Sequence, residues 1–197
     1  MADILLDGLP VLDLLEITPS TSAVARLTRR DQSSISRIYR QVSQRLGLEF
    51  RKHANGAYSA GSNQALLEGL RLSSQHLRLQ RDPTEPRWLT TGSLKAIADA
   101  AHPALPEELV GPRDDLHQLV LKRILDLAVI QRPRGSPAPA PDSPLRERLL
   151  VGSDSGEELL VLRADLEAHP VIQALIATIS GAYRQYQQRH SGLTWLG

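Results

Sequence analysis

The residues best suited to chemistry are short or hydrogen-bonding side chains between positions 21 and 52. Glutamine can bond an adenine edge and arginine a guanine edge in the DNA major groove, while serine hydroxyls and backbone N–H groups reach phosphates. Most of these residues fall in the first turns of a predicted helix or in the turn before it. The side chains expected to face a duplex are Thr21, Arg29, Arg30, Gln32, Ser33, Ser34, Ser36, Arg37, Arg40, Arg51 and Lys52.

Charge is concentrated in the same segment. The formal net charge of the whole chain is only +1. Residues 1–20 contain four acidic residues and no lysine or arginine, whereas residues 21–60 contain eight basic residues and two acidic ones. A local excess of positive charge favours a polyanionic partner, although most charge runs are solvated helix faces.

Catalytic and metal-binding patterns are weak by comparison. The six histidines are scattered, and no two stand at the i, i+4 spacing of a helical metal pair. The segment 152–156 has Asp154 where a nucleophile elbow needs serine. Residues 90–93, Thr-Thr-Gly-Ser, could hold an anion on backbone N–H groups, but an ordinary turn is favoured because phosphate-loop spacing is absent. We expect no enzyme, no cofactor and no metal.

Length and composition set the class of protein. A chain of 197 residues can form one ordinary domain or two small ones. The absence of cysteine excludes a disulfide framework, and 4% aromatic residues supply few stacking platforms for single-stranded nucleic acid. No apolar run reaches the roughly 18 residues of a membrane span. These features predict a soluble cytoplasmic protein.

The first sixty residues are expected to form three short helices and a hairpin. The first helix is predicted over 9–17, and the second, capped by Ser20 or Thr21, ends at a polar turn over 28–31. The third begins after Asp31 as its cap and runs to about Arg45. It carries a buried stripe of Ile35, Ile38, Val42 and Leu46.

Gly47 is expected to end the third helix, and two short strands follow around the Asn-Gly pair at 55–56. The order of helix, helix, turn, helix and hairpin predicts a winged helix-turn-helix domain over residues 1–61. A longer helix over 62–82 follows, and it has apolar or small residues at heptad spacing. This spacing favours pairing with the same helix of a second subunit through Leu66, Leu70, Ser73 and Leu77.

The remaining residues, 86–197, are predicted to form a small α/β domain, so that the fold class is α+β overall. Strands are expected near 87–91, 125–130, 149–151 and 158–163, with helices near 94–101, 115–123 and 170–188. Five prolines within 133–144 predict an extended linker that interrupts this domain.

The N-terminal motifs resemble those of the LysR-type transcriptional regulators. The matching residues are Ala23-Val24-Ala25-Arg26-Leu27, then Asp31-Gln32-Ser33-Ser34-Ile35-Ser36-Arg37, Leu46-Gly47, Arg51-Lys52 and Ser59-Ala60-Gly61. The resemblance covers residues 9–80. It implies a recognition helix that presents Gln32, Ser33, Ser36, Arg37 and Arg40 to double-stranded DNA, and a linker helix that dimerises.

This sequence departs from the family pattern at Asp31, at Tyr39 and at Val42-Ser43. Beyond residue 86 the resemblance is fragmentary, near residues 88–92, 124–130 and 159–179. The family's effector region is about twice as long and has two lobes around an inducer cleft. The resemblance therefore implies a reduced effector domain that lacks this cleft, and small-molecule induction is doubtful.

Two other functions stay open on the sequence alone. One is a protein-interaction module that pairs with other subunits through residues 62–81 and 145–190 and no longer binds DNA. The other is a small-ligand sensor, which would require a pocket lined by Thr90, Thr91, Ser93 and Asp126.

Overall fold

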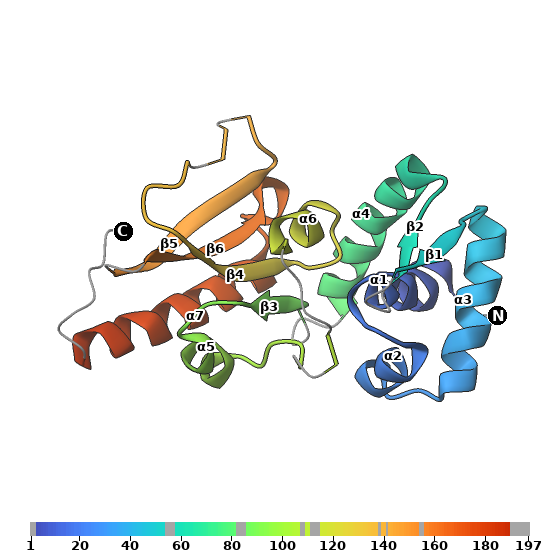
Figure 1. The fold of residues 1–197 in the computed structure, drawn as a ribbon, viewed down its shortest axis with the longest axis horizontal. Coiled ribbons are helices and arrows are strands. Elements are labelled where there is room, and N and C mark those ends of the chain that lie inside the picture. Colours follow the sequence, from blue (N-terminus) through green and yellow to red (C-terminus); the bar gives the residue numbers. More distant parts are fainter. Residues whose placement is uncertain are drawn as a thin grey trace. The chain divides into compact units, whose positions relative to one another are not determined.

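The computed structural model describes residues 3–53, 58–81, 86–106, 109–110, 115–137, 139–140, 142–153 and 156–189. The chain forms two compact units (Figure 1). The first unit contains residues 1–82 together with 106–114 and 122–124. The second contains residues 83–105, 115–121 and 125–197.

The first unit begins with a π-helix, η1 (Ile4–Gly8), which the sequence analysis did not predict. Three α-helices follow, α1 (Leu9–Ile17), α2 (Thr21–Thr28) and α3 (Gln32–Leu46). Strands β1 (Phe50–Lys52) and β2 (Tyr58–Ala60) pair antiparallel, and α4 (Gln64–Arg81) ends the series. The predicted Asn-Gly turn lies outside the described residues.

Helix α1 is the buried centre of this unit. Every residue of α1 except Pro10 is buried, including Asp13 and Glu16. At its start, Gly8 packs directly on α3, because a Cβ there would lie 2.7 Å from Val42 Cγ2. Because glycine has no side chain, α3 can pack closely against the chain at this point.

The second unit contains a four-stranded mixed sheet of order β3-β4-β6-β5. Strand β3 (Trp88–Thr90) lies parallel to β4 (Leu127–Arg132). Strand β6 (Gly156–Arg163) pairs antiparallel with both β4 and β5 (Leu145–Ser153). Helices α5 (Lys95–Ala101) and α7 (Pro170–Arg189) lie on one side of the sheet, and α6 (Leu116–Leu121) lies on the other (Figure 1).

The proline-rich segment does not interrupt this unit. Strands β4 and β5 precede and follow residues 133–144, yet both pair with β6 in one continuous sheet. The predicted strand over 149–151 is also longer in the structure, because β5 begins at Leu145 directly after the segment. The segment is therefore a crossover connection that spans β6, and the prediction of an interruption is wrong.

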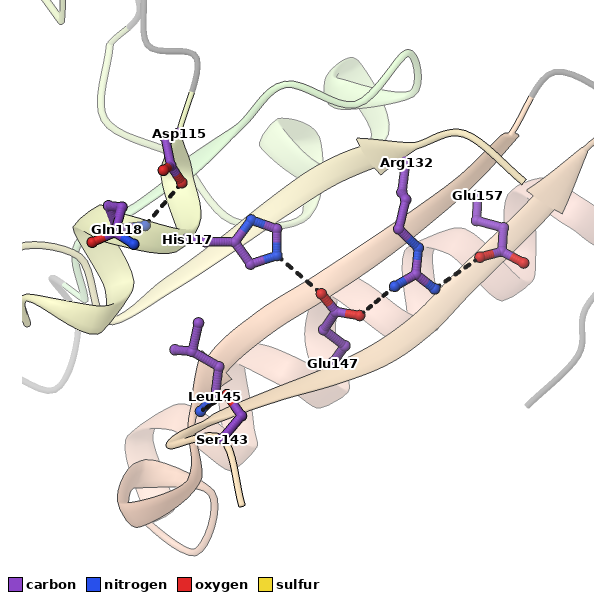
Figure 2. Close-up of polar contacts among 8 residues, drawn as sticks. All are labelled: Asp115, His117, Gln118, Arg132, Ser143, Leu145, Glu147 and Glu157. Carbon is purple, nitrogen blue, oxygen red and sulfur yellow. Dashed lines mark hydrogen bonds and ion pairs between the residues drawn. The ribbon is translucent and has the colours of Figure 1, made fainter. Parts of the chain in front are cut away.

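A line of ionisable side chains crosses one face of the sheet (Figure 2). His117 Nε2 lies 2.9 Å from Glu147 Oε1. Arg132 donates to Glu147 Oε2 at 2.6 Å and to Glu157 Oε2 at 3.0 Å. These contacts join α6, β5, β4 and β6.

No helix within the described part of the chain is both long enough and apolar enough to cross a membrane.

Candidate nucleic-acid interface

Helix α3 has one buried and one exposed face. Ile35, Ile38 and Val42 are buried, and Leu46 is half-buried. On the opposite side, steps of four, three and four residues align an exposed stripe, as expected for 3.6 residues per turn. We name this set the outward stripe: Ser33, Arg37, Arg40 and Gln44. Gln44 is not among the residues predicted to face DNA, although its position four residues after Arg40 indicates the same face.

The outward stripe has guanidinium groups available for a partner. Within the described residues, the side chains of Arg37 and Arg40 have no hydrogen bond or ion pair. Of the other residues predicted to face DNA, Thr21, Ser34 and Ser36 are half-buried. The rest are exposed, namely Arg29, Arg30, Gln32, Arg51 and Lys52.

The turn before α3 holds two arginines in different environments. Arg29 ends α2 in the left-handed conformation, with φ of 52°, and its side chain is exposed. Arg30 donates from Nη2 to Asp7 Oδ1 at 2.5 Å, and this bond lowers the pKa of the Asp7 carboxyl. Arg30 therefore has an intramolecular acidic partner in the free protein, which the sequence analysis did not foresee.

The start of α3 is held by side chains of α2. Gln32 Nε2 donates to Thr21 Oγ1 at 3.1 Å, which joins the first residues of the two helices. Of the two caps predicted for α2, the structure has Ser20, whose hydroxyl accepts from the Ala23 amide. Asp31 occupies the cap position of α3, but its side chain makes no capping hydrogen bond. The predicted position of the cap is therefore confirmed, although the Asp31 side chain does not bond the helix N-terminus.

A depression of about 660 Å³ lies between this turn and the first half of α3. Three arginines line it, together with one acidic, one apolar and two uncharged polar residues. The lining residues are Arg29, Arg30, Asp31, Ser34, Arg37, Ile38 and Gln41. A surface of this composition suits a phosphate oxygen or a base edge.

An aromatic cluster fixes the β1–β2 hairpin on α3. The ring of Tyr39 lies 5.7 Å from that of Phe50 in an edge-to-face arrangement and 5.8 Å from that of Tyr58. Lys52 Nζ lies 5.8 Å from the centre of the Tyr58 ring. Tyr39 thus ties the hairpin that carries Arg51 and Lys52 to the third helix.

The end of α3 is coupled to the segment that begins α4. Gly47 ends the helix in the left-handed conformation, as predicted. Asn63 Nδ2 donates to the carbonyls of Leu46 and Gly47 at 2.9 and 3.1 Å. Ser62 Oγ accepts from the Glu49 amide and donates to the Gly47 carbonyl. These bonds satisfy terminal carbonyls of α3 and set where α4 starts.

Helix α4 buries three polar residues together with two leucines, and it exposes three other leucines. Its buried side includes Arg71, whose guanidinium lies against Asp13 and Glu16 of α1. Leu66 and Leu77 are 46% and 38% exposed, Ser73 is exposed and Leu70 is half-buried. The four residues predicted to pair with a second subunit therefore lie together on the surface of the first unit.

Comparison with known proteins gives no family model and no curated protein that matches. Solved structures do match. One is VV2_1132, a LysR family transcriptional regulator, with 15% identity, a TM-score of 0.30 and coverage of 72% of this chain and 55% of that chain. A second is a mutant of OxyR from Corynebacterium glutamicum with H2O2 bound, with 11% identity, a TM-score of 0.35 and coverage of 96% and 98%.

A third is ArgP from Mycobacterium tuberculosis, with 14% identity, a TM-score of 0.33 and coverage of 90% and 97%. The chain thus spans about half the length of VV2_1132.

The four residues considered for a ligand pocket do not come together. Trp88 of β3 pairs with Leu127 of β4, and Thr90 pairs with Val129, so Thr90 lies at the carboxyl ends of this parallel pair. Asp126 lies at the other end, where its buried carboxylate accepts from the Arg87 amide at 2.6 Å. Because about 3.3 Å separates successive residues of a strand, Asp126 cannot share a small pocket with Ser93.

Proposed function

We propose that this protein is a DNA-binding transcriptional regulator of the LysR type, which acts by binding rather than by catalysis. The observation that carries the proposal is the outward stripe of α3, an exposed row of two arginines, a serine and a glutamine on a helix whose opposite face is buried. An α-helix fits the major groove, where arginine and glutamine can form bidentate bonds with base edges. The first unit is then a winged helix-turn-helix with α3 as its recognition helix.

The surrounding cations suit the phosphate backbone. Arg29 lies in the turn before α3, and Arg51 and Lys52 lie on the hairpin held by Tyr39. Arginine and lysine in such flanking positions contribute affinity that does not depend on sequence and weakens with salt. In this proposal Arg30 exchanges Asp7 for a phosphate when DNA binds.

We further propose that α4 forms a homodimer. Its surface residues predicted to pair are Leu66, Leu70, Ser73 and Leu77. The intervals between them are four, three and four residues, so the order of intervals is the same from either end of the helix. A two-fold axis between Leu70 and Ser73 would therefore place Leu66 of one helix against Leu77 of an antiparallel copy. Two recognition helices held by one symmetric pair would bind a partly symmetric DNA site.

The test is duplex binding as a function of salt concentration, with a duplex selected from a random library by the wild-type protein. We expect Arg37→Ala and Arg40→Ala each to weaken binding by roughly 5- to 150-fold, the range for loss of a bidentate base contact. Arg51→Ala should instead weaken binding to all duplex sequences alike. It should also reduce, by about one, the slope of the logarithm of the binding constant against the logarithm of the salt concentration.

The matched control is Arg134→Ala, which removes an exposed arginine from the second unit. This variant should bind the selected duplex as the wild type does. Undiminished binding by both α3 variants would remove α3 as the recognition helix.

A second candidate function is a protein-interaction module. The observation that favours it is the exposure of Leu66, Leu72 and Leu77 on one helix, which gives α4 an apolar surface even without DNA. A wild-type chain that dimerises but selects no duplex from the library would support this candidate and oppose the first.

A further inference from the structure

The carboxyl group of Glu158 is enclosed by hydrogen-bond donors inside the second unit. Its Oε1 accepts from the Ser93 hydroxyl at 2.6 Å and from the Leu94 amide at 2.9 Å. Its Oε2 accepts from the Tyr183 hydroxyl at 2.6 Å. Both oxygens thus act as acceptors, in the manner of an ionised carboxylate. The donors come from the turn after β3 and from α7, whereas Glu158 belongs to β6.

The site is closed and closely packed. Glu158 is 4% exposed and Tyr183 is 1% exposed. A Cβ on Gly92 would lie 2.8 Å from Glu158 Cδ, so this glycine leaves the space that the carboxyl group occupies. Burial, followed by the hydrogen bond to Glu158, raises the pKa of Tyr183, which keeps its hydroxyl protonated as a donor. A hydroxyl, an amide and a phenol therefore converge on one position that is shaped for a carboxylate.

We propose that residues 92–94 and Tyr183 form a carboxylate-binding site whose ligand is the chain's own Glu158, and that this site accepts an acetate-sized carboxylate once the Glu158 side chain is shortened. The proposal explains why the Thr-Thr-Gly-Ser turn, which could hold an anion, has no room for an external one. It is independent of DNA binding, because every residue involved belongs to the second unit.

The internal ligand has a structural consequence. Residues 93, 158 and 183 are far apart in the sequence, yet one carboxylate joins the β3–α5 turn, strand β6 and helix α7. Hydrogen bonds to a charged group are among the stronger ones in proteins, and a buried donor left without an acceptor is destabilising. Loss of the carboxylate should therefore loosen all three elements together.

The test is thermal unfolding of the full chain with and without sodium acetate, at constant pH and at an ionic strength balanced with sodium chloride. Glu158→Ala removes one CH2 and the carboxylate, which is close to the volume of acetate itself. Tryptophan fluorescence reports on the correct unit, because Trp88 is buried there and residues 1–82 contain no tryptophan. We expect E158A to lower Tm by roughly 4–10 °C.

Acetate should then raise the Tm of E158A with a saturable concentration dependence and should leave the wild type unchanged. The double variant E158A/Y183F keeps the same space but lacks one donor, so acetate should stabilise it less. An acetate effect of equal size in the wild type and E158A, or no effect in either, would overturn the proposal.

A second variant keeps the proposal testable if E158A does not fold. Glu158→Gln preserves shape but replaces one acceptor oxygen with an NH2 group that meets a donor. We expect a lower Tm and an upfield movement of the Leu94 amide proton, because that amide loses its charged acceptor. An E158Q variant with wild-type Tm and an unmoved Leu94 resonance would also overturn the proposal.

Discussion

Arg71 of α4 donates from Nε to Asp13 Oδ1 of α1 at 2.7 Å, and the side chains of both residues are almost completely buried. The same guanidinium donates from Nη2 to Glu16 Oε1 at 2.6 Å. Burial raises the pKa of Glu16, and the Arg71 charge opposes this rise. One buried cation between two carboxylates thus fixes the long helix to the centre of the first unit.

Replacement of this cation should be strongly destabilising. In Arg71→Met, two buried carboxylates lose their bonds to the guanidinium, and we expect unfolding free energy to fall by about 3–5 kcal/mol. Without the opposing Arg71 charge, burial would raise the folded-state pKa of Glu16 further, so the variant gains stability as pH falls toward the unfolded value of glutamate near 4. Denaturant unfolding followed by circular dichroism at several pH values measures both effects.

Two further variants distinguish the effect of losing this buried ion cluster from the effect of losing any arginine. Arg26→Met removes an exposed arginine from α2 and should change stability by less than about 0.5 kcal/mol. Adding Asp13→Asn and Glu16→Gln to Arg71→Met removes the two buried negative charges that Arg71 no longer balances, so part of the stability should return. An Arg71→Met variant as stable as the wild type would contradict the role given to this cluster.

The contact between Gly8 and Val42 supports a second prediction. In Gly8→Ala the added methyl group meets the Val42 side chain, which is β-branched and has little rotamer freedom on a helix. We expect a loss of about 1–3 kcal/mol from overpacking, measured by denaturant unfolding. Gly8→Ala/Val42→Ala should recover part of it. As a control, Gly181→Ala in α7 meets no heavy atom within 4 Å and should be neutral or stabilising.

These contacts also show which features of the first unit could be predicted from the sequence alone. Helix α3 was predictable, because Ile35, Ile38 and Val42 have helical spacing and Gly47 is a strong stop signal. The burial of Asp13 and Glu16 was not, because their partner Arg71 lies 55 or more positions later and charged residues are usually exposed. Ser33, Arg37 and Arg40 of the outward stripe were predicted and Gln44 was not, whereas the contact of Tyr39 with Phe50 and Tyr58 depends on how the hairpin folds back.

The second unit illustrates the same limit for strands. Local apolar runs predicted a strand near 125–130 and another near 158–163, and both exist as β4 and β6. Their pairing across the proline-rich segment depends on long-range register, which no local pattern specifies. Proline composition predicts an irregular connection but does not indicate whether the strands on either side belong to the same sheet.

The bond between Tyr183 and Glu158 gives a third prediction, which concerns pH. The folded-state pKa of Tyr183 is raised above its unfolded value of about 10, so the stability that depends on its protonated form is present below pH 10 and is lost as pH rises further. We expect the second unit, followed by tryptophan fluorescence, to lose up to about 1.4 kcal/mol per pH unit above pH 10. Tyr183→Phe should be less stable at pH 8 but should lose this steep alkaline dependence, and an equally steep slope would exclude Tyr183 as its source.

The exposed leucines of α4 give a fourth prediction, in which two neighbouring surface residues serve as test and control. Leu77 belongs to the stripe with Leu66, Leu70 and Ser73, whereas Leu72 is equally exposed but lies on another side of the helix. Because both side chains are on the surface of the monomer, Leu77→Glu and Leu72→Glu should each fold with near-wild-type stability. Sedimentation equilibrium should then show dissociation to monomers for Leu77→Glu and retained dimers for Leu72→Glu. Dimers in both variants would show that α4 does not pair through this stripe, and Leu77→Glu monomers that bind DNA as tightly as the wild type would show that dimerisation is not needed for recognition.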